Sequence, residues 1–162
     1  MEYIAVSVET RPSLTLPWPE ALLMPIGDVQ LGVPSRDVDR LKRHMEWGLE
    51  HGAYFLGMGD YVDMSAPSDR RRIRTAEFYD TTTEAILEKA ARDEAAFLEA
   101  VDGSACRWLG LLQGHHYTTY PDGTTTDTRL ANALEAPFLG DCASLRITLE
   151  AGKKRKAIAN VL

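Results

Sequence analysis

Three short apolar runs, each ending in a glycine and polar side chains, mark the first two thirds of the chain. They are ALLMPIGD (21–28), AYFLGMGD (53–60) and CRWLGLLQG (106–114). A short, continuous apolar run is typical of a strand that is buried on both faces of a sheet. The pattern therefore predicts three buried strands, each followed directly by polar residues.

Amphipathic segments separate these runs. Residues 34–53 predict a helix, because Val38, Leu41, Met45 and Leu49 form one stripe and Ser35 can cap its start. A longer helix is expected from Glu77 to Val101, and a short one over 129–136. The resulting order β-α-β-α-β is that of an α/β fold, a mixed sheet with helices on its faces.

The two ends of the chain predict further strands. SLRITLE (144–150) and KAIANVL (156–162) are two strands joined by a turn, and EYIAVSVE (2–9) alternates as an edge strand does. Residues 10–20 carry three prolines and are expected to form a loop. We treat residues 1–162 as a single domain.

Composition narrows the class of protein. Hydrophobic residues make up 44% of the chain and the net charge is −6, which is typical of a globular protein whose overall field repels phosphate-rich polymers. The two cysteines are too few for a disulfide framework, so a reducing compartment is expected, with cytoplasm as the default. No apolar stretch is long enough to cross a membrane, and we expect no membrane partner.

Polar clusters follow all three predicted strands, at residues 28–30, 59–63 and 114–116. Ligands of α/β sheets bind at the carboxyl ends of the strands, so we expect these clusters to meet at one edge. Their order resembles that of the calcineurin-like metallophosphoesterases, which read D-x-H, G-D-x-x-D and G-N-H-[E/D], each after a strand. The resemblance covers roughly residues 20–145, which here read D-V-Q, G-D-Y-V-D and G-H-H.

The resemblance implies an αββα sandwich that hydrolyses phosphoesters with two divalent metal ions, manganese first, with iron or zinc as alternatives. Such a pair of ions clamps a phosphoryl group and activates a water. In this family pattern Asp60 would bridge the two ions, His116 would protonate the leaving oxygen, and Asp63 would support the loop. The metal ligands would be Asp28, Gln30, Asp60 and His115.

The chain also departs from that pattern. Gln30 stands where the family has a histidine, Tyr117 stands where it has a carboxylate, and no histidine follows His116. We therefore expect the N-terminal half of such a domain, with uncovered apolar sheet surface through which the chain self-associates. The alternative is a degenerate, non-catalytic relative that serves binding or assembly. An unrelated nucleotide-binding domain is disfavoured, because neither G-x-G-x-x-G nor G-x-x-x-x-G-K-[ST] occurs.

Ordinary structural roles compete with these assignments. Asp28 could cap a loop, and His115 and His116 could be hydrogen-bonded loop residues. Arg70, Arg71 and Arg72 are more often a solvated face, but they follow the second cluster and could bind substrate phosphate. The expected partner is thus a phosphoester substrate, with nucleic acid as one option.

Overall fold

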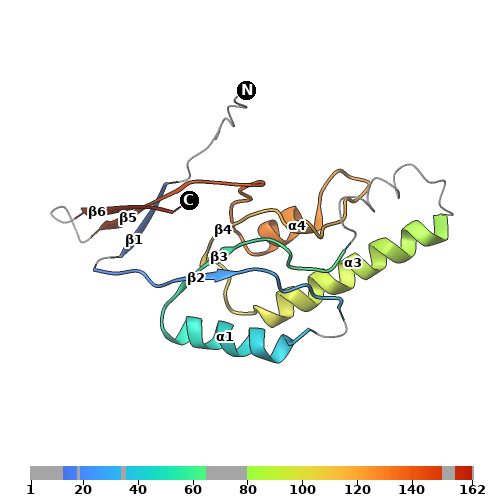
Figure 1. Cartoon of the computed structure of the whole chain (residues 1–162), viewed down its shortest axis with the longest axis horizontal. Helices are drawn as coiled ribbons and strands as arrows, with labels where there is room; N and C mark the ends of the chain where they lie inside the picture. Colours follow the sequence, from blue (N-terminus) through green and yellow to red (C-terminus); the bar gives the residue numbers. More distant parts are fainter. Residues whose placement is uncertain (1–12, 18, 34–35, 65–79, 151–155, 162) are drawn as a thin grey trace, which may run out of the picture.

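Two three-stranded sheets, joined by helices, form the part of the chain that the structure describes (Figure 1). The computed structural model describes residues 13–17, 19–33, 36–64, 80–150 and 156–161. Its elements are β1 (Ser13–Pro17), β2 (Leu23–Ile26), α1 (Val38–Glu50), β3 (Tyr54–Gly57), α3 (Asp80–Ala100), β4 (Trp108–Leu111), α4 (Thr126–Ala133), β5 (Leu145–Glu150) and β6 (Lys156–Val161).

The three apolar runs form one parallel sheet in the order β2-β3-β4. Met24 pairs with Phe55, and Phe55 pairs in turn with Trp108, so neighbouring strands are in sequence order. Parallel neighbours need a crossover, which α1 supplies between β2 and β3 and α3 supplies between β3 and β4. The α/β class and the three strands are confirmed, and all three strands point their carboxyl ends to the same edge. Burial is complete only in β4, whereas β3 is buried at alternate positions and β2 has one buried residue, Ile26.

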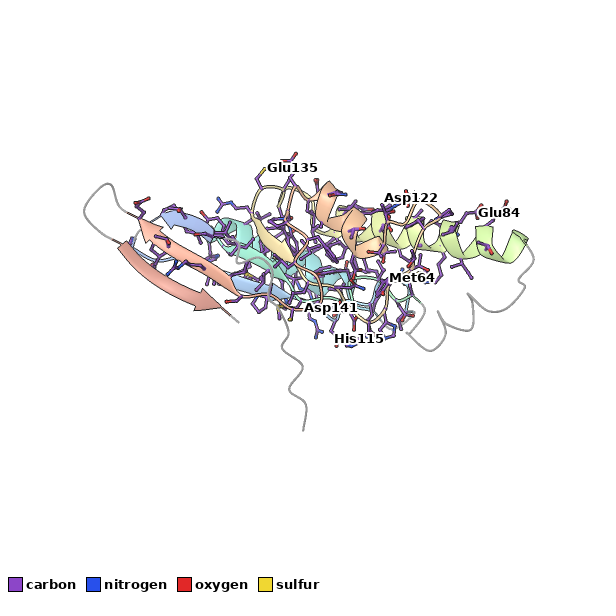
Figure 2. The ribbon with its side chains drawn as sticks, turned by 90° about the horizontal axis from the view of Figure 1, so that it is seen from above. Met64, Glu84, His115, Asp122, Glu135 and Asp141 are labelled. Carbon is purple, nitrogen blue, oxygen red and sulfur yellow. The ribbon has the colours of Figure 1, made fainter. Side chains whose placement is uncertain are left out.

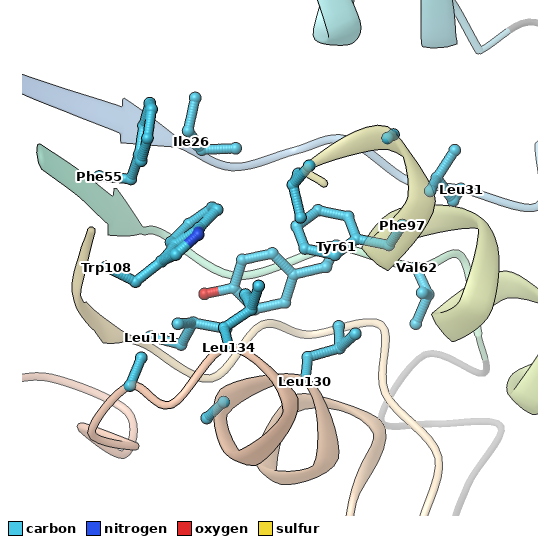
Figure 3. Packing of buried hydrophobic residues seen from close by; sticks show 14 of the residues in the cluster. Ile26, Leu31, Phe55, Tyr61, Val62, Phe97, Trp108, Leu111, Leu130 and Leu134 are labelled. Atoms are coloured by element: carbon cyan, nitrogen blue, oxygen red, sulfur yellow. The ribbon is translucent and has the colours of Figure 1, made fainter. Parts of the chain in front are cut away.

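One face of this sheet packs against the helices and holds the main core (Figure 3). Phe55 and Trp108 point to this face, and their ring centroids lie 5.4 Å apart. Phe97 of α3 lies against Trp108 and also meets the ring of Tyr61 edge-on, with centroids 5.4 Å apart. Figure 1 shows α1 running below β2 and β3. The helix face therefore anchors Tyr61, which belongs to the loop after β3.

The other face of the sheet is covered by β1 and β5, not by helices. Leu109 of β4 is buried in a second cluster with Leu16, Leu145 and Ile147. β1 pairs in parallel with β5, and β5 pairs antiparallel with β6. The expectation of helices on both faces of this sheet thus holds for one face only, because period-two alternation along β3 gives each face its own apolar set. The αββα sandwich that the resemblance implies stays a prediction.

Two local predictions need correction. Residues 13–17 form the edge strand β1 instead of a loop, which proline allows because Pro17 is the last residue of that strand. Helix α4 begins at Thr126, earlier than expected, because Thr125 and Thr128 form a reciprocal capping box. The β5–β6 hairpin is confirmed. The segment 2–9 and Ser35 lie outside the described residues.

The helix after β2 begins later than the sequence pattern suggested. Asp37 is its cap, with a carboxylate oxygen that accepts a hydrogen bond from the backbone N–H of Arg40 at 2.8 Å. Within the described ranges, no helix has the length and apolar character needed to cross a bilayer.

Candidate active site

The loops after β2 and β3 run side by side. The backbone N–H of Asp28 donates to the carbonyl of Gly59 at 3.1 Å, and that of Gln30 donates to the carbonyl of Asp60 at 2.9 Å. The parallel pairing thus continues beyond the strands, as far as a bridge between Leu31 and Val62. The first two polar clusters therefore lie together at the carboxyl edge of the sheet.

Asp28 and Asp60 share an uncommon backbone conformation. Each follows a glycine at a strand end, and each has a φ of 54°, in the left-handed region that few residues other than glycine adopt. Such a conformation costs on the order of 1–3 kcal/mol and is concentrated at functional sites, where the surrounding structure enforces it. Two aspartates on adjacent loops thus share the same strained backbone conformation, which favours a functional site at this edge.

The carboxylate of Asp60 binds the third loop to the second. Its Oδ1 accepts the backbone N–H of His115 at 2.5 Å and that of His116 at 3.1 Å. The backbones also meet closely, since a Cβ on Gly59 would lie 2.7 Å from the Cα of Gly114. A side chain on Gly114 would in turn collide with the backbone of Asp60. Both glycines are therefore needed for this close approach.

Two buried side chains form hydrogen bonds to the backbone of the third loop and of the strand end before it. Asp127, at the start of α4, is fully buried, and its Oδ2 accepts the N–H of Gly114 at 2.8 Å. Tyr61 is also fully buried, and its hydroxyl donates to the carbonyl of Leu112 at 2.8 Å. Burial, with a smaller contribution from the Asp127 and Asp60 carboxylates, raises the pKa of Tyr61, which therefore stays a neutral hydrogen-bond donor.

His116 lies against a carboxylate of the second loop. Its Nδ1 is 3.3 Å from Oδ1 of Asp63 and 3.1 Å from the carbonyl oxygen of Met64. Both neighbours are acceptors, so Nδ1 carries a hydrogen in this arrangement and Nε2 is the nitrogen that remains to exchange a proton. The side chains of His116 and Asp63 are 30% and 35% exposed, which leaves this pair accessible from solvent.

The expected metal ligands lie on neighbouring loops but do not form a compact cluster. Gln30 donates from Nε2 to Oδ1 of Asp28 at 2.8 Å, so its amide faces one of the proposed ligand oxygens. Oδ1 of Asp60 is used by two backbone N–H groups. Among the described residues, no group of three or more His, Cys, Asp or Glu side chains is placed to hold an ion. The ligand roles of these residues stay predictions.

The remaining site predictions have different outcomes. His115 lies at the surface near the same edge (Figure 2), and its backbone is held by Asp60. Arg70, Arg71 and Arg72 lie outside the described residues. Comparison of the chain with protein-family models, with curated proteins and with solved structures finds no match.

Sequence reasoning gave Asp127 no role, and it gave Asp63 a supporting role without identifying its partner. Asp127 lies at the start of α4, and the capping box at Thr125 and Thr128 is the sequence signal for a helix start there. The contact between Asp63 and His116 has no sequence signal in this chain alone, because 53 positions separate them (116 minus 63). These contacts arise only when the carboxyl ends of β3 and β4 become neighbours.

Proposed function

We propose that this chain is a metal-dependent phosphoester hydrolase of the calcineurin-like metallophosphoesterase type, with its site at the carboxyl edge of β2-β3-β4. The proposal is carried by one observation: the Asp60 carboxylate holds the loop that presents His116, and the Asp63 carboxylate faces Nδ1 of the same histidine. A histidine oriented through Nδ1 is suited to deliver a proton from Nε2 to a leaving oxygen.

The donor types fit hard or borderline divalent ions. Asp28, Gln30, Asp60 and His115 offer oxygen and imidazole ligands, which suit manganese, iron or zinc. When bound, such ions polarise a phosphoryl oxygen and lower the pKa of a bound water. The four donors provide only part of the coordination of two ions, so we expect weak Mn²⁺ binding and slow turnover.

The chain's own residues would act as follows. Asp28 and Asp60 would hold cations at the strand ends, where their backbones are already fixed. Asp63 would keep the imidazole of His116 in one tautomer and one orientation. This role for Asp63 offsets the absence of a carboxylate at position 117, which is Tyr117 in this chain.

A second candidate is a non-catalytic relative that keeps the fold for binding or assembly. It is favoured by the lack of a compact group of metal ligands among the described residues, and by the amide of Gln30 that donates to Asp28. The two candidates differ in metal dependence. A protein of the second kind would bind no stoichiometric Mn²⁺ and show no turnover that EDTA removes.

The test compares two phosphodiesters that differ in the leaving group. Bis-p-nitrophenyl phosphate has a good leaving group, whereas a dinucleotide releases an alkoxide that needs a proton. We expect His116→Ala to lower kcat/KM for the dinucleotide by roughly 10²–10⁴-fold and to affect the nitrophenyl diester much less. Asp63→Asn should give a smaller loss with the same preference for the dinucleotide, because it acts through His116.

The matched control is His51→Gln, since His51 lies at the end of α1 and stacks on Trp47, away from this edge. It should leave both rates unchanged. Equal losses on the two substrates for His116→Ala would remove the general-acid role. Wild-type turnover that persists in excess EDTA would remove the metal-dependent mechanism as a whole.

A further inference from the structure

A pocket of about 500 Å³ opens between the Asp28 loop and helix α1. One wall is the end of β2 and the loop that follows it, including Asp28 and Gln30. The other wall carries Arg36, Asp37, Arg40 and His44. Arg40 and His44 are four residues apart on α1, so they lie one turn apart on the same helix face. The pocket therefore joins the proposed reaction site to a basic wall.

The two arginines stand out in an acidic protein of net charge −6. Within the described part of the chain, neither guanidinium forms an ion pair, and Arg36 donates only to the carbonyl of Val33, at 3.1 Å. The nearby carboxylate of Asp37 is already used as the helix cap, accepting the backbone N–H of Arg40. Both guanidinium groups thus keep donors to offer to an anion.

Apart from the polar and charged groups, the lining comes from Pro25, Ile26, Gly27, Val29, Val33 and Leu41. A pocket of this size that combines apolar side chains with charged and polar groups can hold an organic ligand. Guanidinium groups recognise phosphate through paired, charge-assisted hydrogen bonds. The expected ligand is therefore an organic phosphate, with an apolar or aromatic body beside the phosphate group.

We propose that this pocket binds a nucleotide-sized portion of the substrate, with Arg36 and Arg40 holding a phosphate that is not the one cleaved. This proposal rests on the proposed function, because the bound nucleotide is part of a substrate only if the chain is a phosphoester hydrolase. Binding of the nucleotide itself depends only on the two arginines and the pocket. Asp28 forms the border between the two parts, so the scissile phosphate would lie beyond it, at the edge where Asp60 and His116 lie.

The test measures binding of AMP to the whole chain in EDTA by isothermal titration calorimetry, so that no metal ion contributes. We expect a dissociation constant in the range of about 0.1–5 mM, with adenosine at least about tenfold weaker, because charge-assisted hydrogen bonds carry the affinity. The double substitution Arg36→Gln and Arg40→Gln should weaken AMP at least tenfold. Arg40→Gln keeps the backbone N–H that Asp37 accepts, so the helix cap survives.

Arg43→Gln is the matched control, because Arg43 lies on the same helix but does not line the pocket. It should leave AMP binding unchanged. The proposal is overturned if wild-type chain shows no AMP binding up to about 10 mM, or if the control weakens AMP as much as the double variant does. It is also overturned if inorganic phosphate binds as well as AMP, since the apolar walls would then contribute nothing. Mn²⁺-dependent turnover is measured separately. Absence of AMP binding would then contradict the pocket proposal, whereas absence of turnover would contradict the proposed function.

Discussion

Replacing Asp60 in two ways separates its structural role from its proposed metal role. Asp60→Ala removes an acceptor that two backbone N–H groups share, at 2.5 and 3.1 Å. Hydrogen bonds to a charged group contribute about 1.5–3 kcal/mol each, and the lower value applies because Asp60 is partly exposed. Alanine at a φ of 54° adds roughly 1 kcal/mol of backbone strain. The expected loss is therefore about 4 kcal/mol.

Asp60→Asn should cost much less. Asparagine keeps an acceptor oxygen at the Oδ1 position and adopts the left-handed conformation more readily than alanine does. Only the charged character of the two hydrogen bonds is lost, which amounts to about 1–2 kcal/mol. Both losses are measured in EDTA by urea unfolding followed by circular dichroism. Asp141→Ala, at an exposed position, is the control and should change stability by less than about 0.5 kcal/mol.

The affinity for Mn²⁺ should not follow the order of stability of these variants. Because Asp60→Asn stays folded but loses the negative charge, we expect it to lose Mn²⁺ binding measured by electron paramagnetic resonance. Equal destabilisation by alanine and asparagine would refute the view that Asp60 holds the third loop through its acceptor oxygen. Wild-type Mn²⁺ affinity in Asp60→Asn would refute its role as a ligand while leaving its structural role intact.

Three further predictions follow from the fold around the site. Tyr61→Phe should lower the free energy of unfolding by about 1–2 kcal/mol in urea, since the carbonyl of Leu112 loses its donor; an unchanged midpoint would contradict this. Gly114→Ala should cost more than Gly52→Ala in thermal melting, because a side chain at Gly114 meets the backbone of Asp60, whereas one at Gly52 meets nothing within 4 Å and strains only its φ of 69°. Light scattering tests the expected self-association of the chain, although helices cover one face of the β2-β3-β4 sheet and β1 and β5 cover the other; a monodisperse monomer at high concentration would remove that expectation.

Several features of this protein were decided by the sequence alone. The continuous apolar runs specified β2, β3 and β4 as strands, and the stripe of Leu41 and Met45 specified α1. Right-handed crossovers of parallel strands then leave little freedom in the topology. Because carboxyl ends of parallel strands share an edge, the meeting of Asp28 with Asp60 also followed from the pattern.

Other features depend on contacts between distant segments, which periodicity cannot encode. The sequence gives no sign that β1 and β5 cover the second face, since sheet and helix coverings require the same apolar residues. Asp127 resembles any polar residue of a loop until α4 places it, buried, beneath Gly114. Likewise, Asp63 faces His116 only because β3 and β4 bring their following loops within a few ångströms. Local pattern thus determined the elements and their edge, while tertiary packing decided which side chains act on one another there.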